Sequence, residues 1–378
     1  MSDSTSDPGS ATPDPQIDLD ALRVRIDSID EKIISALSER AQVVSDIGRS
    51  KRASGAPIYA PHRERQVLDR VIAANPGPLP DRTIEAIYRE LMSGSFAIEL
   101  PIRVAYLGPR GSLSHVAATR HFGSSVEFDG LDQIEDVFEE VAAGRARYGL
   151  VPYENSIGGG ITDTLDAFPL HDVTVYAEAM IEVEQNLLAN CPQDAITEIH
   201  SKPQIFSQCR HWLQKMFPEA TQIPTLSSSD AVRHVKDAPH AAAIGTLLAG
   251  EIYGVHALFE SIQDKANNIT RFLIIASEAA RPSGDDKTSI MFVTAHKPGA
   301  LVDVLNDFRD AGINLSHIEK RPSGRVNWEY TFFIDVDGHI DDPALQQAVS
   351  AAQAHCVSLQ VLGSYPRTRR ADRSVKDA

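Results

Sequence analysis

Three consecutive polar residues, Glu154, Asn155 and Ser156, are the first candidates for binding or catalysis in the chain. They follow an apolar run at residues 148–151 that predicts a buried parallel strand. Three glycines and a candidate helix N-cap, Thr162, come next. Ligands bind beyond the carboxyl ends of strands in open α/β sheets, and glycine lets the backbone approach them. The pattern predicts a ligand-binding site; an ordinary glycine-rich strand-to-helix turn is the alternative.

A second candidate group is basic and lies in a long helical pattern. No proline interrupts residues 16–56, where apolar residues at a spacing of three and four predict a packed helix about 50 Å long. These apolar residues are Leu19, Leu22, Ile26, Ile29, Ile33, Ala36, Val43 and Ile47. Arg40 takes the place of an apolar residue on the same face. Because a buried unpaired arginine is costly, Arg40 predicts either a bound anion or a structural salt bridge with a local carboxylate.

Lys51 and Arg23 extend this basic group along the helix. Lys51 lies about 16 Å from Arg40 along the axis but only about 20° around it, so both side chains can reach one small dianion. Arg23 lies about 25 Å from Arg40, too far to share a small ligand within one subunit. It can reach the equivalent site of a partner chain, and the geometry therefore predicts an intertwined dimer.

The elements that position these residues fall into three segments. Two shorter helical patterns, at 63–74 and 82–98, complete an all-helical segment at 17–100. Strand-like runs then alternate with helical runs such as 134–143 and 203–216, which predicts an α/β domain at 101–280. After a linker, the order strand, helix, strand, strand, helix, strand predicts a ferredoxin-like α+β domain at 287–365.

The composition limits the classes of partner. The 378 residues are enough for two or three domains, and a net charge of −16 argues against nucleic acid as a partner. Cys191, Cys209 and Cys356 are odd in number and widely spaced, which predicts neither a disulfide framework nor a metal site. Residues 1–16 have the composition of a disordered tail, and no apolar run is long enough to cross a membrane. We expect a cytoplasmic protein.

Three motifs of the α/β segment resemble those of prephenate dehydratases. Residues 151–158 are similar to the V-P-x-E-N-S signature of that family, residues 268–272 resemble its T-R-F element, and residues 108–114 resemble its first glycine loop. The resemblance implies a two-lobed fold like that of periplasmic binding proteins, with the site in the cleft. It also implies that prephenate loses its ring hydroxyl and ring carboxylate to give phenylpyruvate, with no cofactor.

The same resemblance implies roles for individual residues. Thr270 would donate or relay the proton to the leaving hydroxyl, Arg271 would neutralise or orient a substrate carboxylate, and Phe272 would form a wall of the pocket. The other residues assigned to prephenate are Ser112, Asn155, Ser156 and Gln204. Ser201 is the expected N-cap of the helix that carries Gln204. Lys202 stands where the family usually has histidine.

The helical segment resembles the all-helical chorismate mutases found fused to the dehydratase. The similar residues are Leu22, Arg23, Asp30, Glu31, Lys32, Glu39, Arg40, Lys51, Arg63 and Glu64. The resemblance implies that the basic side chains bind the carboxylates and ether oxygen of chorismate, with Arg23 supplied by the partner chain, while Glu64 holds the substrate hydroxyl. Ser95 and Glu99, at i and i+4, would share the face toward the ligand. Ala60 replaces an aspartate of some relatives.

The implied rearrangement needs neither a nucleophile nor a cofactor. It is unimolecular, so the enzyme has to hold a chair-like conformer and to stabilise negative charge on the breaking ether oxygen. The residues assigned to stabilise that charge are Arg40, Lys51 and Glu99. Glu99 stands where relatives have glutamine, and only its protonated form can donate a hydrogen bond.

The C-terminal segment resembles the ACT regulatory domains that are fused to dehydratases. Residues 296–301 are similar to their G-A-L motif, and residues 318–322 resemble their E-S-R-P motif with Lys320 in place of serine. The resemblance implies that phenylalanine, the product of the pathway, binds as an effector at a subunit interface. The residues assigned to it are Gly299, Ala300, Leu301, Asn314, Glu319 and Arg321.

On these motifs the chain is identified as a member of the bifunctional chorismate mutase–prephenate dehydratases, forming a homodimer or larger homo-oligomer and inhibited by phenylalanine. One alternative is an arogenate or prephenate dehydratase with an inactive mutase domain. Another is a non-catalytic amino-acid-sensing binding protein. The basic residues of the helical segment and the motif at 270–272 argue against both.

Overall fold

The first of two compact units in the structure is a long helix. The computed structural model describes residues 18–54, 59–99, 101–323 and 329–368, and the chain divides into Met1–Ala56 and Pro57–Ala378. Helix α1 (Leu19–Ser54) has 36 residues, about 54 Å at 1.5 Å per residue, which confirms the predicted long helix. The side chains of its apolar face are open to solvent, for example Leu22 (44 % exposed), Ile29 (45 %) and Ile33 (50 %).

Two further helices open the second unit. They are α2 (Pro61–Ala73) and α3 (Asp81–Glu99), within two residues of the predicted bounds. Helix α2 begins at a proline, whose fixed φ suits the first helical position. Met92 and Phe96 of α3 belong to the same buried cluster as Tyr59 and Phe122, so this helical pair packs on the α/β domain.

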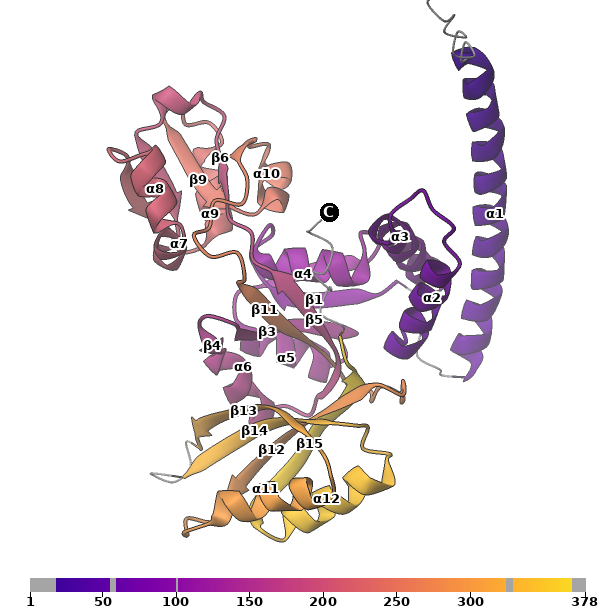
Figure 1. Cartoon of the computed structure of the whole chain (residues 1–378), viewed down its shortest axis with the longest axis vertical. Coiled ribbons are helices and arrows are strands. Elements are labelled where there is room, and N and C mark those ends of the chain that lie inside the picture. Colours follow the sequence, from indigo (N-terminus) through magenta and orange to yellow (C-terminus); the bar gives the residue numbers. More distant parts are fainter. Residues whose placement is uncertain (1–17, 55–58, 100, 324–328, 369–378) are drawn as a thin grey trace, which may run out of the picture. The chain divides into compact units, whose positions relative to one another are not determined.

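The first lobe of the α/β domain is a mixed sheet with helices on both faces (Figure 1). The strands lie in the order β2 (Glu127–Leu131), β1 (Arg103–Leu107), β3 (Tyr148–Asn155), β11 (Ile269–Ala276) and β5 (Thr174–Glu182), with β4 (Gly159–Gly160) paired to β3. Helix α4 (Leu113–Phe122) packs on one face, and α5 (Ile134–Ala142) and α6 (Thr162–Ala167) on the other. Strand β3 is parallel to β1 and antiparallel to β11, so the predicted parallel strand is confirmed on one side only.

The second lobe is a smaller mixed sheet inserted between β5 and β11. Its strands lie in the order β10 (Ala257–Phe259), β6 (Asn186–Leu188), β9 (Ala241–Gly245), β7 (Glu198–Ser201) and β8 (Thr221–Pro224). Its helices are α7 (Pro203–Gln208), α8 (Arg210–Met216), α9 (Ser228–Val235) and α10 (Leu247–Tyr253). The chain crosses between the lobes twice, which matches the expected two-lobed plan.

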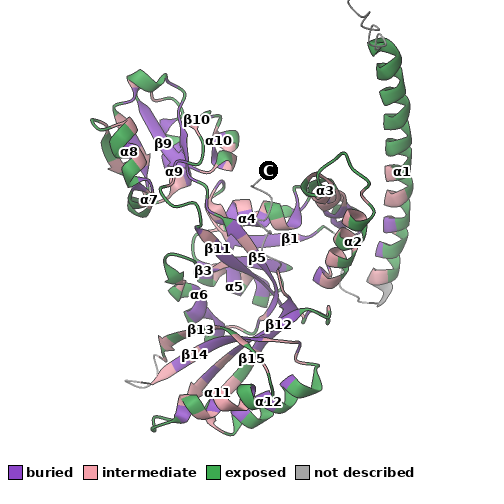
Figure 2. Cartoon of the chain, viewed as in Figure 1, coloured by how far each residue is buried: buried purple, intermediate pink, exposed green. Residues whose placement is uncertain are grey.

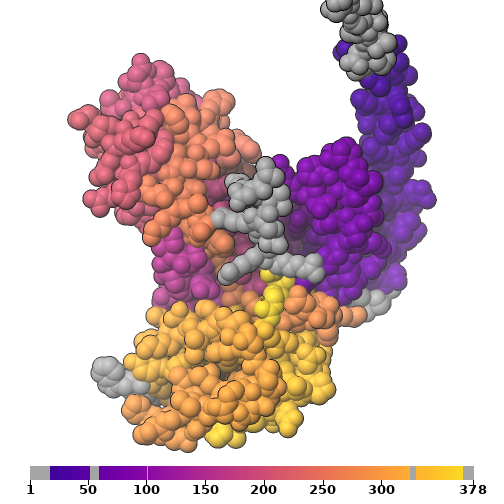
Figure 3. All heavy atoms as spheres, viewed as in Figure 1, coloured from indigo at the N-terminus to yellow at the C-terminus, as the bar shows by residue number. Residues whose placement is uncertain are grey.

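The C-terminal domain has the predicted βαββαβ order. An antiparallel sheet, ordered β13 (Leu315–Pro322), β14 (Tyr330–Asp337), β12 (Asp286–Thr294) and β15 (Cys356–Pro366), carries α11 (Ala300–Asp310) and α12 (Pro343–Gln353) on one face. The other face of this sheet meets the first lobe, where Phe333, Leu362 and Tyr365 join the apolar cluster of α5 and α6. In Figure 3 the spheres of the C-terminal domain adjoin those of the first lobe, and Figure 2 shows that buried residues concentrate in the strands.

Several local predictions were wrong. The stretch at 203–216 forms two helices that meet at Cys209. Ser201 ends β7, and its hydroxyl donates to the carbonyl oxygen of Ile244 (2.9 Å), while Lys202 occupies the N-cap position. Thr162 is the first residue of α6, after Ile161 at its N-cap. At Ser201, the contact with Ile244 in another strand withdraws the hydroxyl from the capping role that local propensity predicts.

Candidate functional site

Asn155 and Thr270 face each other at the ends of two neighbouring strands. They are direct partners in the ladder between β3 and β11. Asn155 Nδ2 donates to Thr270 Oγ1 (3.0 Å) and to Oδ1 of Asn268 (2.7 Å), while its own Oδ1 accepts from the backbone N–H groups of Ile157 and Gly158. Because the Thr270 hydroxyl accepts from Asn155, its proton is available to a further acceptor. This arrangement presents a fixed hydroxyl donor.

Asn268 was not assigned a role from the sequence, although it belongs to the motif at 268–272. Its side chain is buried (4 % exposed) and accepts from Asn155. Ser156 lies next to this group. Its hydroxyl donates to the carbonyl oxygen of Asn267 (3.2 Å) and accepts from the Ile269 N–H (3.0 Å). The hydroxyl of Ser156 therefore holds the start of β11, so its role here is to position Thr270.

The structure corrects the prediction for Arg271. Successive residues of a strand point to opposite faces of the sheet, so Arg271 points away from the face that carries Thr270. Its guanidinium group is only 6 % exposed and contacts Glu178 (2.8 Å) and Asp335 (2.5 Å). Arg271 thus pairs with two carboxylates on the face of the sheet opposite Thr270. Phe272 returns to the face of Thr270, but its ring is in the core (1 % exposed) and supports the site from beneath.

Ser112 and Gln204 lie on other elements. Ser112 caps α4, where its hydroxyl accepts from the His115 N–H (3.3 Å) and donates to the Leu107 carbonyl oxygen (3.2 Å). Gln204 is exposed on α7 in the second lobe. The structure therefore brings Asn155, Ser156 and Thr270 together without either residue.

The glycine loop before α4 joins the two lobes. The Gly111 carbonyl oxygen accepts from Thr246 Oγ1 (2.6 Å), and the Arg110 carbonyl oxygen accepts from the Ser229 hydroxyl, both donors belonging to the second lobe. Gly111 has a φ of +81°, and a Cβ there would lie 2.9 Å from Ala249. Only glycine allows this close approach. The loop thus anchors the second lobe next to the first.

Glu64 is the centre of a polar cluster on the helical pair. Arg89 Nη1 donates to Glu64 Oε1 (2.9 Å) and to the carbonyl oxygen of His121 in α4 (3.1 Å), and Arg89 Nη2 donates to Glu85 (3.0 Å). Burial raises the pKa of Glu64 to about 7, against the opposing effect of Arg89. The carboxyl group of Glu64 therefore changes its charge near neutral pH.

The other residues assigned in the helical segment vary in exposure. Arg23 is exposed and pairs with Asp20 (3.0 Å), Arg63 is exposed and donates to Gln66 (3.3 Å), and Arg40 and Lys51 are partly buried. Ser95 and Glu99 are both buried, and the Ser95 hydroxyl donates to the Leu91 carbonyl oxygen (2.7 Å).

A pocket of about 250 Å³ lies at the start of α11. Its lining includes Gly299, Ala300 and Leu301, three of the residues assigned to the effector, with Tyr330 and Phe332 of β14. Gly299 has a φ of +83°, a backbone conformation that other residues rarely adopt. The mixture of small residues, backbone groups and aromatic rings suits a small ligand with an apolar part.

The structure places Glu319 and Arg321 away from this pocket. Alternation along β13 points both toward the first lobe, away from the helix-covered face that carries Tyr330 and Phe332. Arg321 pairs there with Asp166 of α6 (2.7 Å). Lys320 points to the opposite face, and its Nζ lies 5.1 Å from the centre of the Tyr330 ring.

Asn314 is the remaining residue assigned to the effector. It is exposed just before β13, and its Nδ2 donates to Asp337 Oδ2 (3.3 Å). Asn314 is not part of the pocket lining at the start of α11.

Comparison with known proteins covers most of the chain. Residues 22–100 match the family model of type II chorismate mutases, residues 104–280 that of prephenate dehydratases, and residues 288–353 that of ACT domains. The bifunctional chorismate mutase/prephenate dehydratase of Stutzerimonas stutzeri is 43 % identical, over 92 % of this chain and 98 % of its own length. The enzyme of the same name from Aquifex aeolicus is 38 % identical, over 93 % and 98 %.

Two solved structures each resemble 70 % of this chain. Prephenate dehydratase of Arthrobacter aurescens in complex with L-Phe is 31 % identical with a TM-score of 0.66, over 70 % of this chain and 90 % of that one. Prephenate dehydratase of Staphylococcus aureus is 27 % identical with a TM-score of 0.62, over 70 % and 100 %. Among the described helices of this chain, none is both long and apolar enough to span a membrane.

Proposed function

We propose, from the premise that the chain belongs to the bifunctional chorismate mutase/prephenate dehydratases, that the Asn155–Thr270 pair carries the dehydratase step and that phenylalanine regulates it. The chain rearranges chorismate to prephenate and converts prephenate to phenylpyruvate. The observation that carries the assignment is the hydrogen bond from Asn155 Nδ2 to Thr270 Oγ1 (3.0 Å).

The dehydratase step breaks two bonds of prephenate. The carbon–carbon bond to the ring carboxylate breaks, its electron pair enters the ring, and CO₂ leaves. The carbon–oxygen bond to the ring hydroxyl breaks, and the hydroxyl leaves as water after it gains a proton. Thr270 is assigned to donate or relay that proton, because Asn155, which also donates to Asn268, donates to the Thr270 oxygen and leaves its hydroxyl proton available. Phe272 supports Thr270 from the core, and Ser156 holds the start of β11.

The mutase step needs positive charge and hydrogen-bond donors around chorismate. The residues assigned to it are Arg23 of the partner chain, Arg40, Lys51, Arg63, Glu64, Ser95 and Glu99. A 10⁶-fold acceleration corresponds to about 8 kcal/mol, which two or three preorganised charged donors can supply. The exposed apolar face of α1 supports a homodimer, because a second copy of this helix would cover it.

Phenylalanine is assigned to the pocket at Gly299, Ala300 and Leu301. The pocket offers backbone groups for a zwitterion and the rings of Tyr330 and Phe332 for the aromatic side chain. The complex of the Arthrobacter aurescens relative with L-Phe supports this choice of effector. Since both reactions belong to amino-acid biosynthesis, we place the enzyme in the cytoplasm.

The test is to supply purified protein with chorismate and to follow prephenate and phenylpyruvate separately. Both products are expected in sequence, and added phenylalanine should slow the second more than the first. Prephenate that accumulates without phenylpyruvate would contradict the dehydratase assignment. Turnover of arogenate and prephenate, with none of chorismate, would favour the alternative of an inactive mutase domain.

The mutase activity is expected to depend on pH through Glu64. Because its pKa is raised to about 7, the carboxyl group is mostly protonated at pH 6 and mostly ionised at pH 8. An ionised carboxylate accepts a hydrogen bond from the substrate hydroxyl more strongly than the neutral acid does. We therefore expect kcat/KM for chorismate to rise several-fold from pH 6 to pH 8, and Glu64→Gln to abolish this rise.

Glu85 provides the control for this measurement. Its carboxylate bonds to the same arginine, Arg89 (3.0 Å), but from an exposed position. Glu85→Gln should keep the rise with pH. A rise that persists in Glu64→Gln would assign the titration to another group.

Phenylalanine is expected to raise the melting temperature. At a concentration 100 times its dissociation constant, a ligand that binds only the folded state stabilises it by about 2.7 kcal/mol. Gly299→Leu should abolish this increase and the inhibition, because a side chain at a φ of +83° moves the backbone of the pocket.

Gly312 is a matched glycine at the end of α11, with a φ of +70° and open space around it. Gly312→Leu imposes the same kind of backbone strain outside the pocket and should keep the response to phenylalanine. Equal loss of the response in both variants would mean that strain in the domain, and not the pocket, is responsible.

A further inference from the structure

The candidate catalytic pair is followed along the sheet by a second pair that the C-terminal domain holds. In the ladder between β11 and β3, Thr270 is opposite Asn155, and Arg271 is opposite Glu154. Each residue of the second pair is thus the chain neighbour of a residue of the first. A change in the position of Arg271 or Glu154 therefore shifts the backbone that orients the side chains of Thr270 and Asn155.

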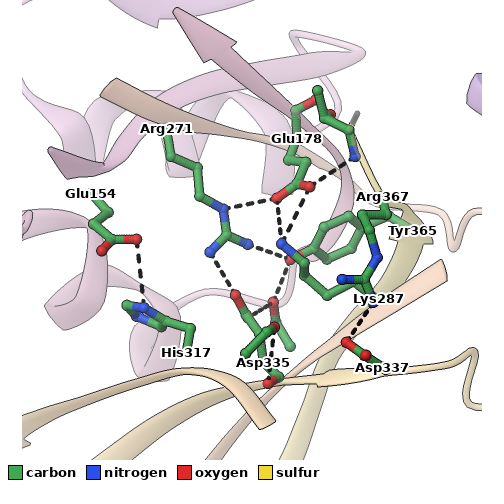
Figure 4. Close-up of polar contacts among 12 residues, drawn as sticks. Glu154, Glu178, Arg271, Lys287, His317, Asp335, Asp337, Tyr365 and Arg367 are labelled. Carbon is green, nitrogen blue, oxygen red and sulfur yellow. Dashed lines mark hydrogen bonds and ion pairs between the residues drawn. The ribbon is translucent and has the colours of Figure 1, made fainter. Parts of the chain in front are cut away.

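Arg271 is bound from the C-terminal domain. Its Nη1 donates to Asp335 Oδ2 of β14 (2.5 Å) and its Nη2 donates to the hydroxyl of Tyr365 of β15 (2.9 Å). Ser289 of β12 donates to the other oxygen of Asp335 (2.6 Å). Although burial opposes it, Arg271 and Lys287 hold the pKa of Asp335 below its usual range. Figure 4 shows the guanidinium group between Glu178, Asp335 and Tyr365.

The network is buried and balanced in charge. Glu178 of β5 contacts both Arg271 (2.8 Å) and Lys287 of β12 (3.0 Å). The side chains of Glu178 and Asp335 are 0 % exposed, and those of Arg271 and Lys287 are 6 % and 9 % exposed. In this buried group two cations face two carboxylates, so each charge depends on the position of the others.

Glu154 is bound from the same place in the C-terminal sheet. His317 of β13 places its Nδ1 3.5 Å from Glu154 Oε2, and its ring lies 5.5 Å from that of Tyr153. His317 and Asp335 are direct partners in the ladder between β13 and β14. His317 and Asp335 of the C-terminal domain therefore contact Glu154 and Arg271 of the first lobe.

The backbone is irregular at this point. The ladder between β11 and β3 shifts its register between Arg271 and Phe272. Such an irregularity interrupts the regular hydrogen bonding of the strands and re-aims neighbouring side chains. The direction of Thr270 is therefore set partly by what holds Arg271.

The effector pocket and the network share strand β14. Tyr330 and Phe332 line the pocket on the helix-covered face, and Asp335, further along the strand, binds Arg271 on the other face. A ligand that moves β14 from one face changes the position of the carboxylate on the other.

We propose that His317 and Asp335 form a clamp on Glu154 and Arg271, through which the C-terminal domain positions Asn155 and Thr270 and transmits effector binding to them. Arg271 is in this view a positioning residue and contacts no substrate. The inference rests on the proposed function, because it takes Thr270 as the catalytic group and phenylalanine as the effector.

The test compares Asp335→Asn and His317→Asn with the unmodified full-length protein. Both substitutions keep the approximate shape and weaken one side of the clamp. We expect Asp335→Asn to lower the dehydratase kcat about tenfold with KM for prephenate within about twofold, and to raise the half-inhibitory concentration of phenylalanine at least about fivefold. Combining it with His317→Asn should add less than the product of the separate effects, because the two residues act on one pair.

Asp166→Asn is the matched control. It breaks the ion pair with Arg321, which joins the same two domains at a more exposed position and away from β11. It should leave kcat and the response to phenylalanine unchanged. The same losses in Asp166→Asn would overturn the clamp, since any contact between the domains would then suffice.

If Asp335→Asn does not fold, Tyr365→Phe tests the clamp instead. It keeps every charge and removes the hydroxyl that accepts from Arg271 and is hydrogen-bonded to Ser289 (2.6 Å). A loss of about threefold in kcat with a weakened response to phenylalanine supports the clamp. Unchanged values in a folded variant would overturn it. An unmodified protein without dehydratase activity or without a phenylalanine response would instead overturn the proposed function.

Discussion

A Thr270→Val variant is expected to lose at least about 10²-fold in the rate of phenylpyruvate formation from prephenate. Valine keeps the shape of threonine but removes the hydroxyl, whose oxygen accepts from Asn155 Nδ2 (3.0 Å). Without it, the leaving hydroxyl of prephenate lacks its proton donor, and the Asn155 amide loses a partner. The measurement is the dehydratase kcat with prephenate as substrate, together with prephenate accumulation from chorismate.

Two companion variants separate chemistry from stability. Thr270→Ser keeps a hydroxyl and should retain most of the activity. Thr174→Val removes a threonine hydroxyl from β5 in the same sheet, where it donates to the Leu362 carbonyl oxygen (2.8 Å), and should leave the dehydratase rate within about twofold. Near-normal phenylpyruvate production by Thr270→Val would exclude a central role for this residue.

An Arg40→Ala variant is expected to lose about 10²-fold or more in mutase rate while the dehydratase rate with prephenate persists. The loss corresponds to about 3 kcal/mol, the scale of one preorganised donor to a developing negative charge. Arg40 is partly buried on α1, in line with the apolar residues of one face. The measurement is the rate of chorismate consumption, with prephenate turnover recorded on the same preparation.

Arg49 serves as the control, because it is an exposed arginine of the same helix that lies about 180° around the axis from Arg40. Arg49→Ala should keep both activities. If Arg40→Ala instead lowers both activities equally and reduces the melting temperature, the arginine belongs to a structural salt bridge. That outcome would restore the alternative that the sequence pattern left open.

Most elements followed from periodicity. The spacing of apolar residues in 19–47 predicted α1, and the change of period after Pro101 predicted the α/β domain. The order of elements beyond residue 286 predicted the ferredoxin-like domain. These patterns depend only on neighbouring residues, so they can be recognised in the sequence without knowledge of the fold. The breaks at Cys209 and the cap at Lys202 were missed because contacts from other segments, such as Ser201 to Ile244, decide them.

The dehydratase motif was read from the sequence, but its internal geometry was not. Asn155 and Thr270 were both assigned, and the structure makes them ladder partners although 115 positions separate them. The sequence did not predict the buried network around Arg271. Its members come from four different strands, and each is an ordinary residue in its local context: Glu178, Lys287, Asp335 and Tyr365. A buried ionic network of this kind exists only after the strands have paired.

The sequence by itself determined the domain order, most of the secondary structure and the residue types of the candidate active-site and effector motifs, since these depend on local pattern. The tertiary structure decided which face each side chain takes. In a strand, a shift of one residue moves a side chain to the opposite face, and the irregular register next to Arg271 and His317 cannot be read from local sequence. For that reason Arg271, Glu319 and Arg321 join the contact between domains, while Thr270 alone of the 270–271 pair remains at the candidate active site.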